Sequence, residues 1–242
     1  MLYTSTSNPK IKELKKLQQK KYRDQSGMFF VEGEHLVMEA YKTGNLLELF
    51  LKEGTTSSLP VETSILTEEL LCYLSEVETP QPMIGLCRKK EFEHELKNKI
   101  LILDGIQDPG NLGTIIRSAV AFHIDQIVLG EHTVDPFNGK VVRSSQGMIF
   151  KAHFVEEPLT TILPTLKKLG HTILGTSVID GKEVRTFSKM EKFAIIMGNE
   201  GNGMRNELEP FCDASLYIKM AEECESLNVG VATSIILYEL DK

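Results

Sequence analysis

The sequence contains few cysteines and no recognisable metal-binding motif. Its four cysteines form no CxxC pair, and its six histidines form neither an HxH nor an HExxH pattern. No apolar run approaches the length of a membrane-spanning helix. The opening residues, MLYTSTSNPKIK, lack the apolar core of a signal peptide. These absences predict a cytoplasmic protein with reduced, mostly buried thiols, no metal site and no membrane contact.

Size and charge leave several classes open. At 242 residues, of which 41% are hydrophobic and 25% charged, the chain fits one large soluble domain or two small ones. The net charge of −7 argues weakly against nucleic acid, yet residues 1–23 carry seven basic side chains and one acid. Three lysines spaced by four, Lys12, Lys16 and Lys20, are expected on one helix face, where they could bind phosphates. From charge alone, a solvated helix face explains the pattern better than phosphate binding does.

Charge and hydrophobic patterning divide the chain into two parts. Short strand and helix signals up to residue 87, beginning with a helix start at Asn8 and Pro9, predict a small α/β unit, followed by the highly charged segment RKKEFEHELKNK. From residue 100 onward, apolar strands alternate with amphipathic helices, which predicts a mostly parallel sheet covered on both faces. The expected strands include 126–129, 172–176 and 193–197, and a helix is expected over 204–211. The expected organisation is a domain over 1–92, a charged linker over 93–99, also interpretable as a surface helix, and a second domain over 100–242.

Three polar turns follow apolar strands in the second part. They lie in LDGIQDPGNLGTIIRSAVAF (103–122), IIMGNEGNGM (195–204) and IKMAEECESLNVGVA (218–232). Glycine in a strand-to-helix turn exposes backbone N–H groups and lets a ligand approach the main chain. The three turns therefore predict one composite site at the strand ends of an α/β sheet.

The same turns carry a family resemblance. DPGNLG followed by RSA, then MGNEGNGM, then SLNV, in that order, resembles the SpoU family of RNA ribose 2'-O-methyltransferases, which belongs to the SPOUT class. The likeness covers roughly residues 100–240. It implies a catalytic domain with a trefoil knot, a small preceding substrate-binding domain and S-adenosylmethionine as cofactor. It also implies an RNA substrate, ribosomal more readily than transfer RNA, and a homodimer formed through the catalytic domain with help from the final helix.

The resemblance assigns roles residue by residue. It implies catalytic roles for Asn111, Arg117, Glu200, Ser226 and Asn228, cofactor contacts at Gly198, Ile218 and Leu227, and RNA contact at Arg143. Arginine hardly ever loses its proton, so Arg117 is expected to hold the target phosphate and polarise the hydroxyl, while a substrate phosphate or water takes the proton. Glu200 could orient a neighbouring side chain or offset the sulfonium charge. The family serine two residues after Asn228 is here Gly230.

Simpler explanations exist for each residue. Asn111 could merely cap a helix, Ser226 or Asn228 could do the same, and Arg117 and Arg143 could be solvated surface residues. A non-catalytic RNA-binding or ribosome-assembly protein on the same scaffold is the main alternative, although the implied catalytic residues are all present. A Rossmann oxidoreductase is disfavoured because DPGNLG is not GxGxxG and no acidic residue closes a second strand at the required spacing.

Overall fold

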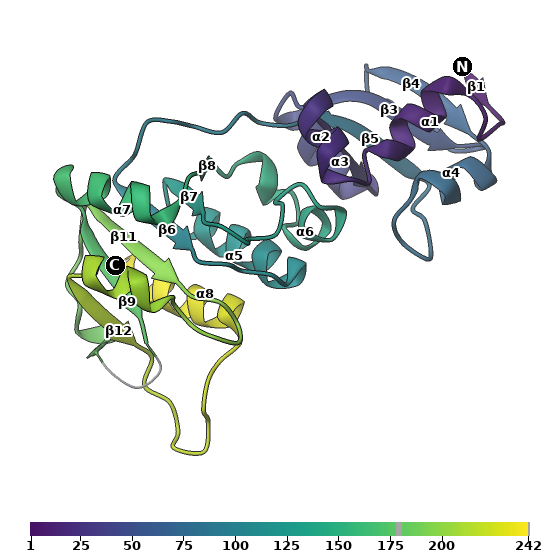
Figure 1. The fold of residues 1–242 in the computed structure, drawn as a ribbon. Coiled ribbons are helices and arrows are strands. Elements are labelled where there is room, and N and C mark those ends of the chain that lie inside the picture. Colours follow the sequence, from purple (N-terminus) through teal and green to yellow (C-terminus); the bar gives the residue numbers. More distant parts are fainter. Residues whose placement is uncertain (178–180, 242) are drawn as a thin grey trace. The chain divides into compact units, whose positions relative to one another are not determined.

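The structure is a computed structural model that describes residues 1–177 and 181–241. These residues pack into two compact units, which Figure 1 shows as ribbons. The first unit combines Met1–Lys90 with the later segment Asp135–Lys151, and the second combines Glu91–Val134 with the chain from Ala152 onward. None of the described helices is long and apolar enough to cross a lipid bilayer.

The first unit is a five-stranded mixed sheet with helices packed against it. The strand order is β1-β4-β3-β5-β2; β1, β4 and β3 pair in parallel, whereas β5 is antiparallel to β3 and β2. Its elements from residues 1–90 are β1 (Leu2–Tyr3), α1 (Pro9–Lys16), α2 (Lys20–Ser26), β2 (Met28–Glu32), α3 (Glu34–Lys42), β3 (Leu46–Lys52), β4 (Glu62–Leu66), α4 (Glu68–Leu74) and β5 (Met83–Arg88).

The lysine-rich N-terminal segment forms two helices, so the expectation of one continuous helix face is wrong. As predicted, α1 begins at Asn8, whose side chain accepts a hydrogen bond from the Lys10 N–H at 2.9 Å. It ends at Lys16, and the N–H groups of residues 17–19 bond to carbonyls three positions earlier instead of four. The Gln18 side chain donates to the carbonyls of Leu74 and Ser75 at the end of α4. Gln19 is extended and starts α2. Tertiary contacts thus override the helical spacing of the lysines.

A segment from the middle of the chain completes the first unit. Residues 135–151 contain α6 (Gly139–Ser144) and the 3₁₀ turn η1 (Met148–Phe150). Their aromatic rings pack on Phe29 of β2, with centroid distances of 4.9 Å to Phe137 and 5.9 Å to Phe150. Asp135 pairs with Arg23 at 2.6 Å, and both side chains are buried. This segment therefore lies in the core of a unit built mainly from the N-terminal residues.

The second unit confirms the predicted parallel α/β fold. All pairings in its seven-stranded sheet, β10-β12-β9-β11-β6-β7-β8, are parallel. Its elements are β6 (Lys99–Leu103), α5 (Pro109–Ala121), β7 (Gln126–Leu129), β8 (Phe154–Glu156), α7 (Leu159–Lys168), β9 (Thr172–Thr176), β10 (Lys182–Glu183), η2 (Val184–Thr186), β11 (Phe193–Met197), η3 (Asn206–Phe211), β12 (Ala214–Tyr217) and α8 (Val229–Leu240).

The central strands of this sheet are buried on both faces. Ile100 and Ile102 of β6 join a core with α7 and η3, while the alternate residues Leu101 and Leu103 are equally buried and point to the opposite face. Helices α5 and α8 pack against each other, and the Ser118 and Ser234 hydroxyls are 2.6 Å apart. The 204–211 region, expected to be an α-helix, contains only the 3₁₀ helix η3, in which Pro210 lacks an N–H.

The charged segment before β6 is neither helix nor strand over residues 89–98. The surface-helix interpretation of this stretch is therefore wrong. All four cysteines are free thiols, and Cys72 and Cys224 are exposed, so the expectation of mostly buried thiols holds for only part of the set.

Candidate active site

The carboxyl ends of β6 and β11 mark the switch point of the parallel sheet. From β6 the chain proceeds outward through β7 and β8, then returns to the other side of β6 to form β9 and β11. At such a point the loops that follow two neighbouring strands diverge and leave a crevice in which α/β proteins bind ligands. Here the two loops are the first and second glycine-bearing turns, as the sequence predicts.

Asp108, rather than Asn111, caps helix α5. The Asp108 carboxylate accepts a hydrogen bond from the Asn111 backbone N–H at 2.8 Å, with Pro109 at the first helical position. Asn111 is thus the third residue of the helix, and capping does not explain its side chain. The simple alternative for Asn111 is wrong, because the aspartate three residues earlier supplies the cap.

The side-chain amide of Asn111, which does not cap the helix, links residues from all three turns. Its Nδ2 donates to Glu200 Oε1 at 3.0 Å, and its Oδ1 accepts from Asn228 Nδ2 at 2.8 Å. Asn228 is also the N-cap of α8, accepting from the Gly230 and Val231 N–H groups. The three side chains therefore form one hydrogen-bonded chain, in which each amide orientation is fixed by its partners.

Glu200 is held by the first turn. Its carboxylate accepts hydrogen bonds from the backbone N–H groups of Gln107 and Asp108, in addition to the Asn111 amide. Partial burial acts to raise the pKa of Glu200, but these hydrogen bonds outweigh burial, and the pKa lies below its usual value. Glu200 is consequently ionised at neutral pH and is a weak base, which fits a residue that orients its neighbours.

The second turn has no space for side chains at its first residue. A Cβ on the buried Gly198 would lie 2.1 Å from the Met204 backbone N, so only glycine fits at this position. Ile218 and Leu227 are half-buried at either end of the third turn, and Leu227 directly precedes Asn228. The backbone groups of the cofactor candidates thus lie on turns that the Asn111–Glu200–Asn228 chain connects.

Comparison with known proteins decides the family. Residues 98–238 match the SpoU rRNA methylase family, and residues 8–85 match the MRM3-like substrate-binding domain. The chain belongs to the SpoU family. It is 40% identical to the 23S rRNA (guanosine(2553)-2'-O)-methyltransferase RlmP of Bacillus subtilis, over 98% of this chain and 97% of that protein.

Solved structures agree with this SpoU assignment. The S-adenosylmethionine-bound rRNA methyltransferase from Sinorhizobium meliloti is 28% identical with a TM-score of 0.86, covering 99% of this chain and 97% of that one. An RNA 2'-O ribose methyltransferase is also 28% identical, with a TM-score of 0.85 and coverage of 99% and 98%. The predictions of a SpoU-family, S-adenosylmethionine-dependent RNA 2'-O-methyltransferase with a substrate-binding domain before its catalytic domain are confirmed.

Two further SpoU candidates lie apart from the hydrogen-bonded chain. Arg117 is exposed on α5 and makes no hydrogen bond or ion pair with any described residue. Six positions separate it from Asn111, so the two side chains leave α5 in different directions. Ser226 is exposed on the third turn, and its carbonyl, not its hydroxyl, accepts a bond from Cys224 Sγ. Within residues 1–177 and 181–241, no three potential metal-ligating side chains cluster.

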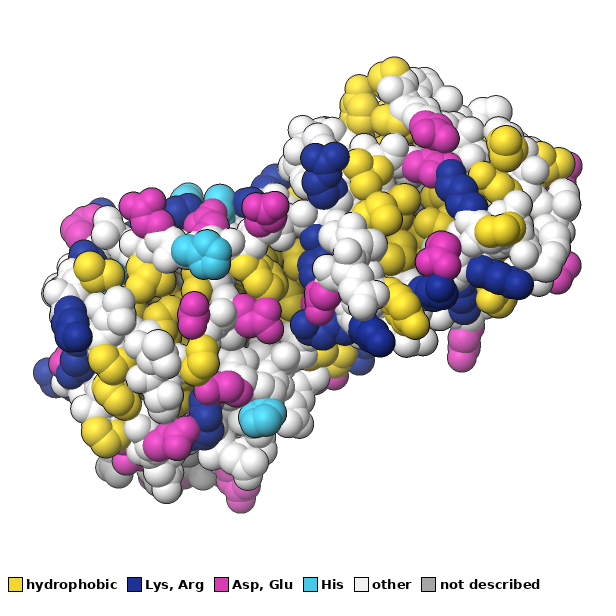
Figure 2. Space-filling view, turned by 45° about the horizontal axis from the view of Figure 1, so that its top comes forward, with side chains coloured by type: hydrophobic (Ala, Val, Ile, Leu, Met, Phe, Trp, Pro, Cys, Tyr) yellow, Lys and Arg dark blue, Asp and Glu magenta, His cyan; other side chains and the backbone are white. Residues whose placement is uncertain are grey.

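The lysine candidates are partly neutralised. Lys16 pairs with Glu13 at 2.6 Å and Lys20 with Asp24 at 2.8 Å, whereas Lys12 is exposed and makes no ion pair with the described residues. On the face drawn in Figure 2, acidic and basic side chains are interspersed on each unit. The pairs are solvent-exposed and weak, so a phosphate could replace their carboxylates.

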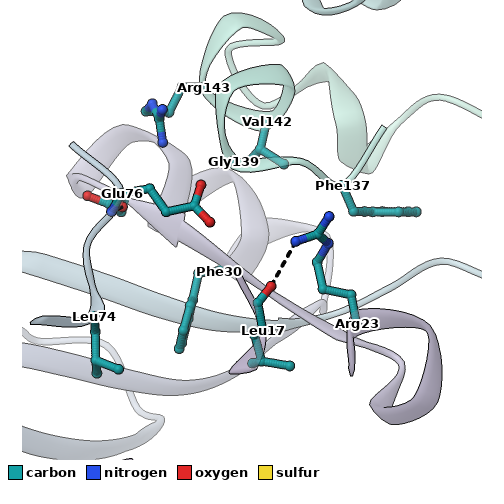
Figure 3. Close-up of a pocket in the computed structure, with 10 residues that line it drawn as sticks. Leu17, Arg23, Phe30, Leu74, Glu76, Phe137, Gly139, Val142 and Arg143 are labelled. Atoms are coloured by element: carbon teal, nitrogen blue, oxygen red, sulfur yellow. Dashed lines mark hydrogen bonds between the residues drawn. The ribbon is translucent and has the colours of Figure 1, made fainter. Parts of the chain in front are cut away.

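Arg143 lines a small cavity within the first unit. Figure 3 shows it beside the Glu76 carboxylate, with Arg23 hydrogen-bonded to the Leu17 carbonyl. The cavity has a volume of about 20 Å³, room for roughly one water molecule. A Cβ on Gly139 would lie 2.1 Å from Glu76 Oε2. The cavity is too small for a nucleotide and is separate from the three turns.

Sequence reasoning missed Asp104 and Arg205. Asp104 directly follows β6 and is almost fully buried, and Arg205 Nε donates to Asp104 Oδ1 at 2.6 Å. The available signal was an aspartate that closes an apolar strand, LILD, immediately before the first turn. A buried carboxylate needs a partner, but nothing in the spacing pointed to Arg205, about a hundred residues away.

Proposed function

We propose that this enzyme methylates a ribose 2'-hydroxyl of 23S ribosomal RNA. The observation that carries the chemistry is the hydrogen-bonded chain Asn111–Glu200–Asn228, which joins three turns at the switch point of the sheet. Support for the substrate comes from RlmP, whose 40% identity extends over almost the whole chain. Action on ribosomal RNA also fits the cytoplasmic location expected from the sequence.

The cofactor contacts are assigned to the turns. S-adenosylmethionine, when bound, supplies a methyl group already made electrophilic by the sulfonium. Gly198, Ile218 and Leu227 hold it through their backbone, because a glycine turn and two half-buried apolar residues offer N–H and carbonyl groups close to a ligand. The first and third turns are fixed to each other through Asn111 and Asn228, so the pocket is set before the ligand arrives.

The remaining side chains act on the RNA. Asn111 and Asn228 are oriented by Glu200 and by the cap of α8, and they position the target ribose together with Ser226. Arg117 binds a phosphate of the target nucleotide with its planar fork and polarises the hydroxyl. Glu200 keeps its negative charge throughout because its pKa is lowered. The hydroxyl proton leaves to a substrate phosphate or to water.

RNA contact is also assigned to Arg143 and to Lys12, Lys16 and Lys20 in the first unit. The catalytic unit is proposed to form a homodimer through α8. One side of that helix is buried within the unit at Ile236 and Leu240, but Val231 is 46% and Tyr238 is 62% exposed. Two large apolar side chains two turns apart on an exposed face are typical of a helix that packs against a second subunit.

A methyl-transfer assay tests the proposal. Purified enzyme is incubated with labelled S-adenosylmethionine and with 23S rRNA, 16S rRNA or total tRNA from cells lacking the enzyme. The modified ribose is then mapped. We expect label only in 23S rRNA, and none in an oligonucleotide carrying 2'-deoxyribose at the mapped position. Labelling of tRNA alone would overturn the substrate assignment. RNA binding without any transfer would favour the non-catalytic alternative.

A further inference from the structure

Arg205 is the most highly connected side chain beside the candidate active site. It follows the second turn and reaches three carboxylates: Nε donates to Asp104 Oδ1 at 2.6 Å, Nη2 to Glu131 Oε2 at 2.8 Å, and Nη1 to Glu207 Oε1 at 2.9 Å. Asp104 directly follows β6, and Glu131 lies just after β7. One guanidinium therefore ties the second turn to the ends of two neighbouring strands.

Asp104 closes the second turn at both ends. Its backbone N–H donates to the Met197 carbonyl at 2.9 Å, where β11 stops. Its carboxylate accepts from the Arg205 backbone N–H at 2.8 Å, where the turn finishes. The next residue, Gly105, accepts from Asn199 Nδ2 at 2.7 Å. The loop from Gly198 to Met204 is thus fastened to the end of β6 through the two residues that flank it, Met197 and Arg205, and through Asn199.

The Arg205–Asp104 pair is placed where it can be strong. The Asp104 side chain is 1% exposed, so little water competes for its carboxylate, and two N–H groups of Arg205 approach its two oxygens. Without the guanidinium, a buried carboxylate would lose its charged partner. The ion pairs of Arg205 with Glu131 and Glu207 are weaker, since these two side chains are 35% and 56% exposed.

We propose that Arg205, acting through Asp104, is a positioning residue that holds the second turn in its cofactor-binding conformation. The turn carries Gly198 and Glu200. Its internal hydrogen bonds all involve Asn199, which bonds with Gly201, Asn202 and Gly203, so they shape the turn but do not attach it to the sheet. If only a fraction of the molecules hold the turn in its binding conformation, the measured affinity for the cofactor falls to that fraction of its full value. The inference rests on the proposed cofactor contact at Gly198.

The test compares Arg205→Lys with wild type and with the control Lys167→Met. A lysine keeps the charge but cannot reach Asp104, Glu131 and Glu207 together. The control removes a 2.9 Å ion pair with Asp213, whose carboxylate holds the start of β9, away from the second turn. Calorimetry with S-adenosylhomocysteine gives Kd, kinetics give KM for S-adenosylmethionine and for RNA, and thermal unfolding gives Tm.

We expect Arg205→Lys to raise the Kd for S-adenosylhomocysteine about tenfold if the competent conformation falls to about a tenth of the population. KM for S-adenosylmethionine should rise in step while KM for RNA stays constant. Lys167→Met should lower Tm without changing Kd. If Arg205→Lys does not fold, Glu131→Gln serves instead. It removes the ion pair between Glu131 and Arg205 and should give a smaller rise in Kd.

An unchanged Kd in Arg205→Lys, or an equal rise in Lys167→Met, would overturn the positioning role and leave Arg205 as a general stabiliser. Failure of the wild-type enzyme to bind S-adenosylhomocysteine would instead overturn the cofactor contact at Gly198, and the positioning role with it.

Discussion

Arg117 is the candidate catalytic residue that stands outside the Asn111–Glu200–Asn228 chain. It is exposed and has no ion-pair partner among the described residues, so no protein carboxylate neutralises it. The Arg117 guanidinium can therefore bind a phosphate of the substrate. This separates it from Arg205 and Arg23, whose guanidinium groups are committed to carboxylates of their own units.

We expect Arg117→Ala to lower kcat by roughly 10²–10³-fold, as removal of one transition-state donor does elsewhere. The Kd for S-adenosylhomocysteine should stay at the wild-type value, because the Arg117 side chain makes no hydrogen bond or ion pair with the described residues of the three turns. Arg117→Lys should also fail, since a point charge does not reproduce the planar fork. Arg185→Ala, another exposed arginine of this unit, is the matched control. Full activity of Arg117→Ala on native RNA would make it a surface residue.

Residue types were predicted better than residue roles. The resemblance placed Asn111, Glu200 and Asn228 in one site. In the structure, Asn111 is hydrogen-bonded to Glu200 at 3.0 Å and to Asn228 at 2.8 Å. Which side chain caps α5 could not be read from DPGN, because Asp108 and Asn111 are both good caps. Asp104 could have been noticed as the aspartate that closes an apolar strand, but its partner Arg205 could not, because ion pairs between distant positions leave no periodic signal.

At the scale of elements, the segment before β6 is fixed by a polar cluster rather than by regular structure. The Glu93 N–H donates to the Phe154 carbonyl at 2.8 Å, and the buried Gln126 side chain donates to Glu93 and Glu95 and accepts from the Lys97 N–H. His153 makes a short hydrogen bond to Glu93. Charge content alone suggested a linker, but the glutamine on β7 gives these residues defined partners.

This cluster should make stability depend on acidity. Burial acts to raise the pKa of Glu93, but hydrogen bonds from Gln126, His153 and Lys97 outweigh it and lower the pKa to about 2 from 4.5. A depressed carboxyl pKa stabilises the fold above the unfolded-state value, and that contribution is lost as pH falls from 4.5 towards 2.

We therefore expect the free energy of unfolding of wild type to fall more steeply below pH 4.5 than that of Glu93→Gln, with a constant difference above it. Urea unfolding at a series of pH values measures both curves. Glu191→Gln, at an exposed carboxylate of the same unit, is the control. Parallel curves for wild type and Glu93→Gln below pH 4.5 would contradict the role of this cluster.

Strand prediction succeeded where buried residues follow one another and failed where they do not. The positions of β7, β9 and β11 were predicted residue for residue, since each contains at least three consecutive buried residues between turn signals. In contrast, β4 and β1 were missed. β4 has no two consecutive buried residues, and β1 has only two residues, which pair with β4.

At the scale of the whole molecule, an enzyme with a net charge of −7 must bind a polyanion. We expect Lys12→Gln, Lys16→Gln and Lys20→Gln together to weaken RNA binding and to reduce the log–log salt slope by up to about two units if all three contact single-stranded phosphates. Filter binding at several salt concentrations measures both, and cofactor affinity should not change.

The control for that triple variant carries the same charge change elsewhere, at Lys42, Lys52 and Lys189, which are exposed on other elements. Equal effects of the two triple variants would mean that net charge, not the lysines of α1 and α2, governs RNA affinity. No change in either would leave Arg117 and Arg143 as the basic residues assigned to RNA contact.

The buried Arg23–Asp135 pair should hold residues 135–151 in the first unit. Arg23 Nε and Nη2 donate to Asp135, and Nη1 donates to the carbonyls of Leu17 and Gln18. Asp135→Ala leaves a buried guanidinium without its counter-ion, so we expect a loss of about 3–5 kcal/mol in the free energy of unfolding. Glu13→Ala, which breaks the exposed pair with Lys16, should cost at most about 1 kcal/mol. Similar losses in both variants would contradict this.

The first unit is built from two separate stretches of the sequence, which limits how its domains can be exchanged with those of relatives. A substrate-binding domain taken as a continuous piece of sequence, the natural choice from the 8–85 match, would leave Phe137, Phe150 and Asp135 without Phe29 and Arg23. Recombination between relatives should therefore transfer residues 1–90 and 135–151 together, with junctions after Val134 and before Ala152. The same pairing means that substitutions in β2 and α2 should coevolve with those in α6, although family boundaries assign them to different domains.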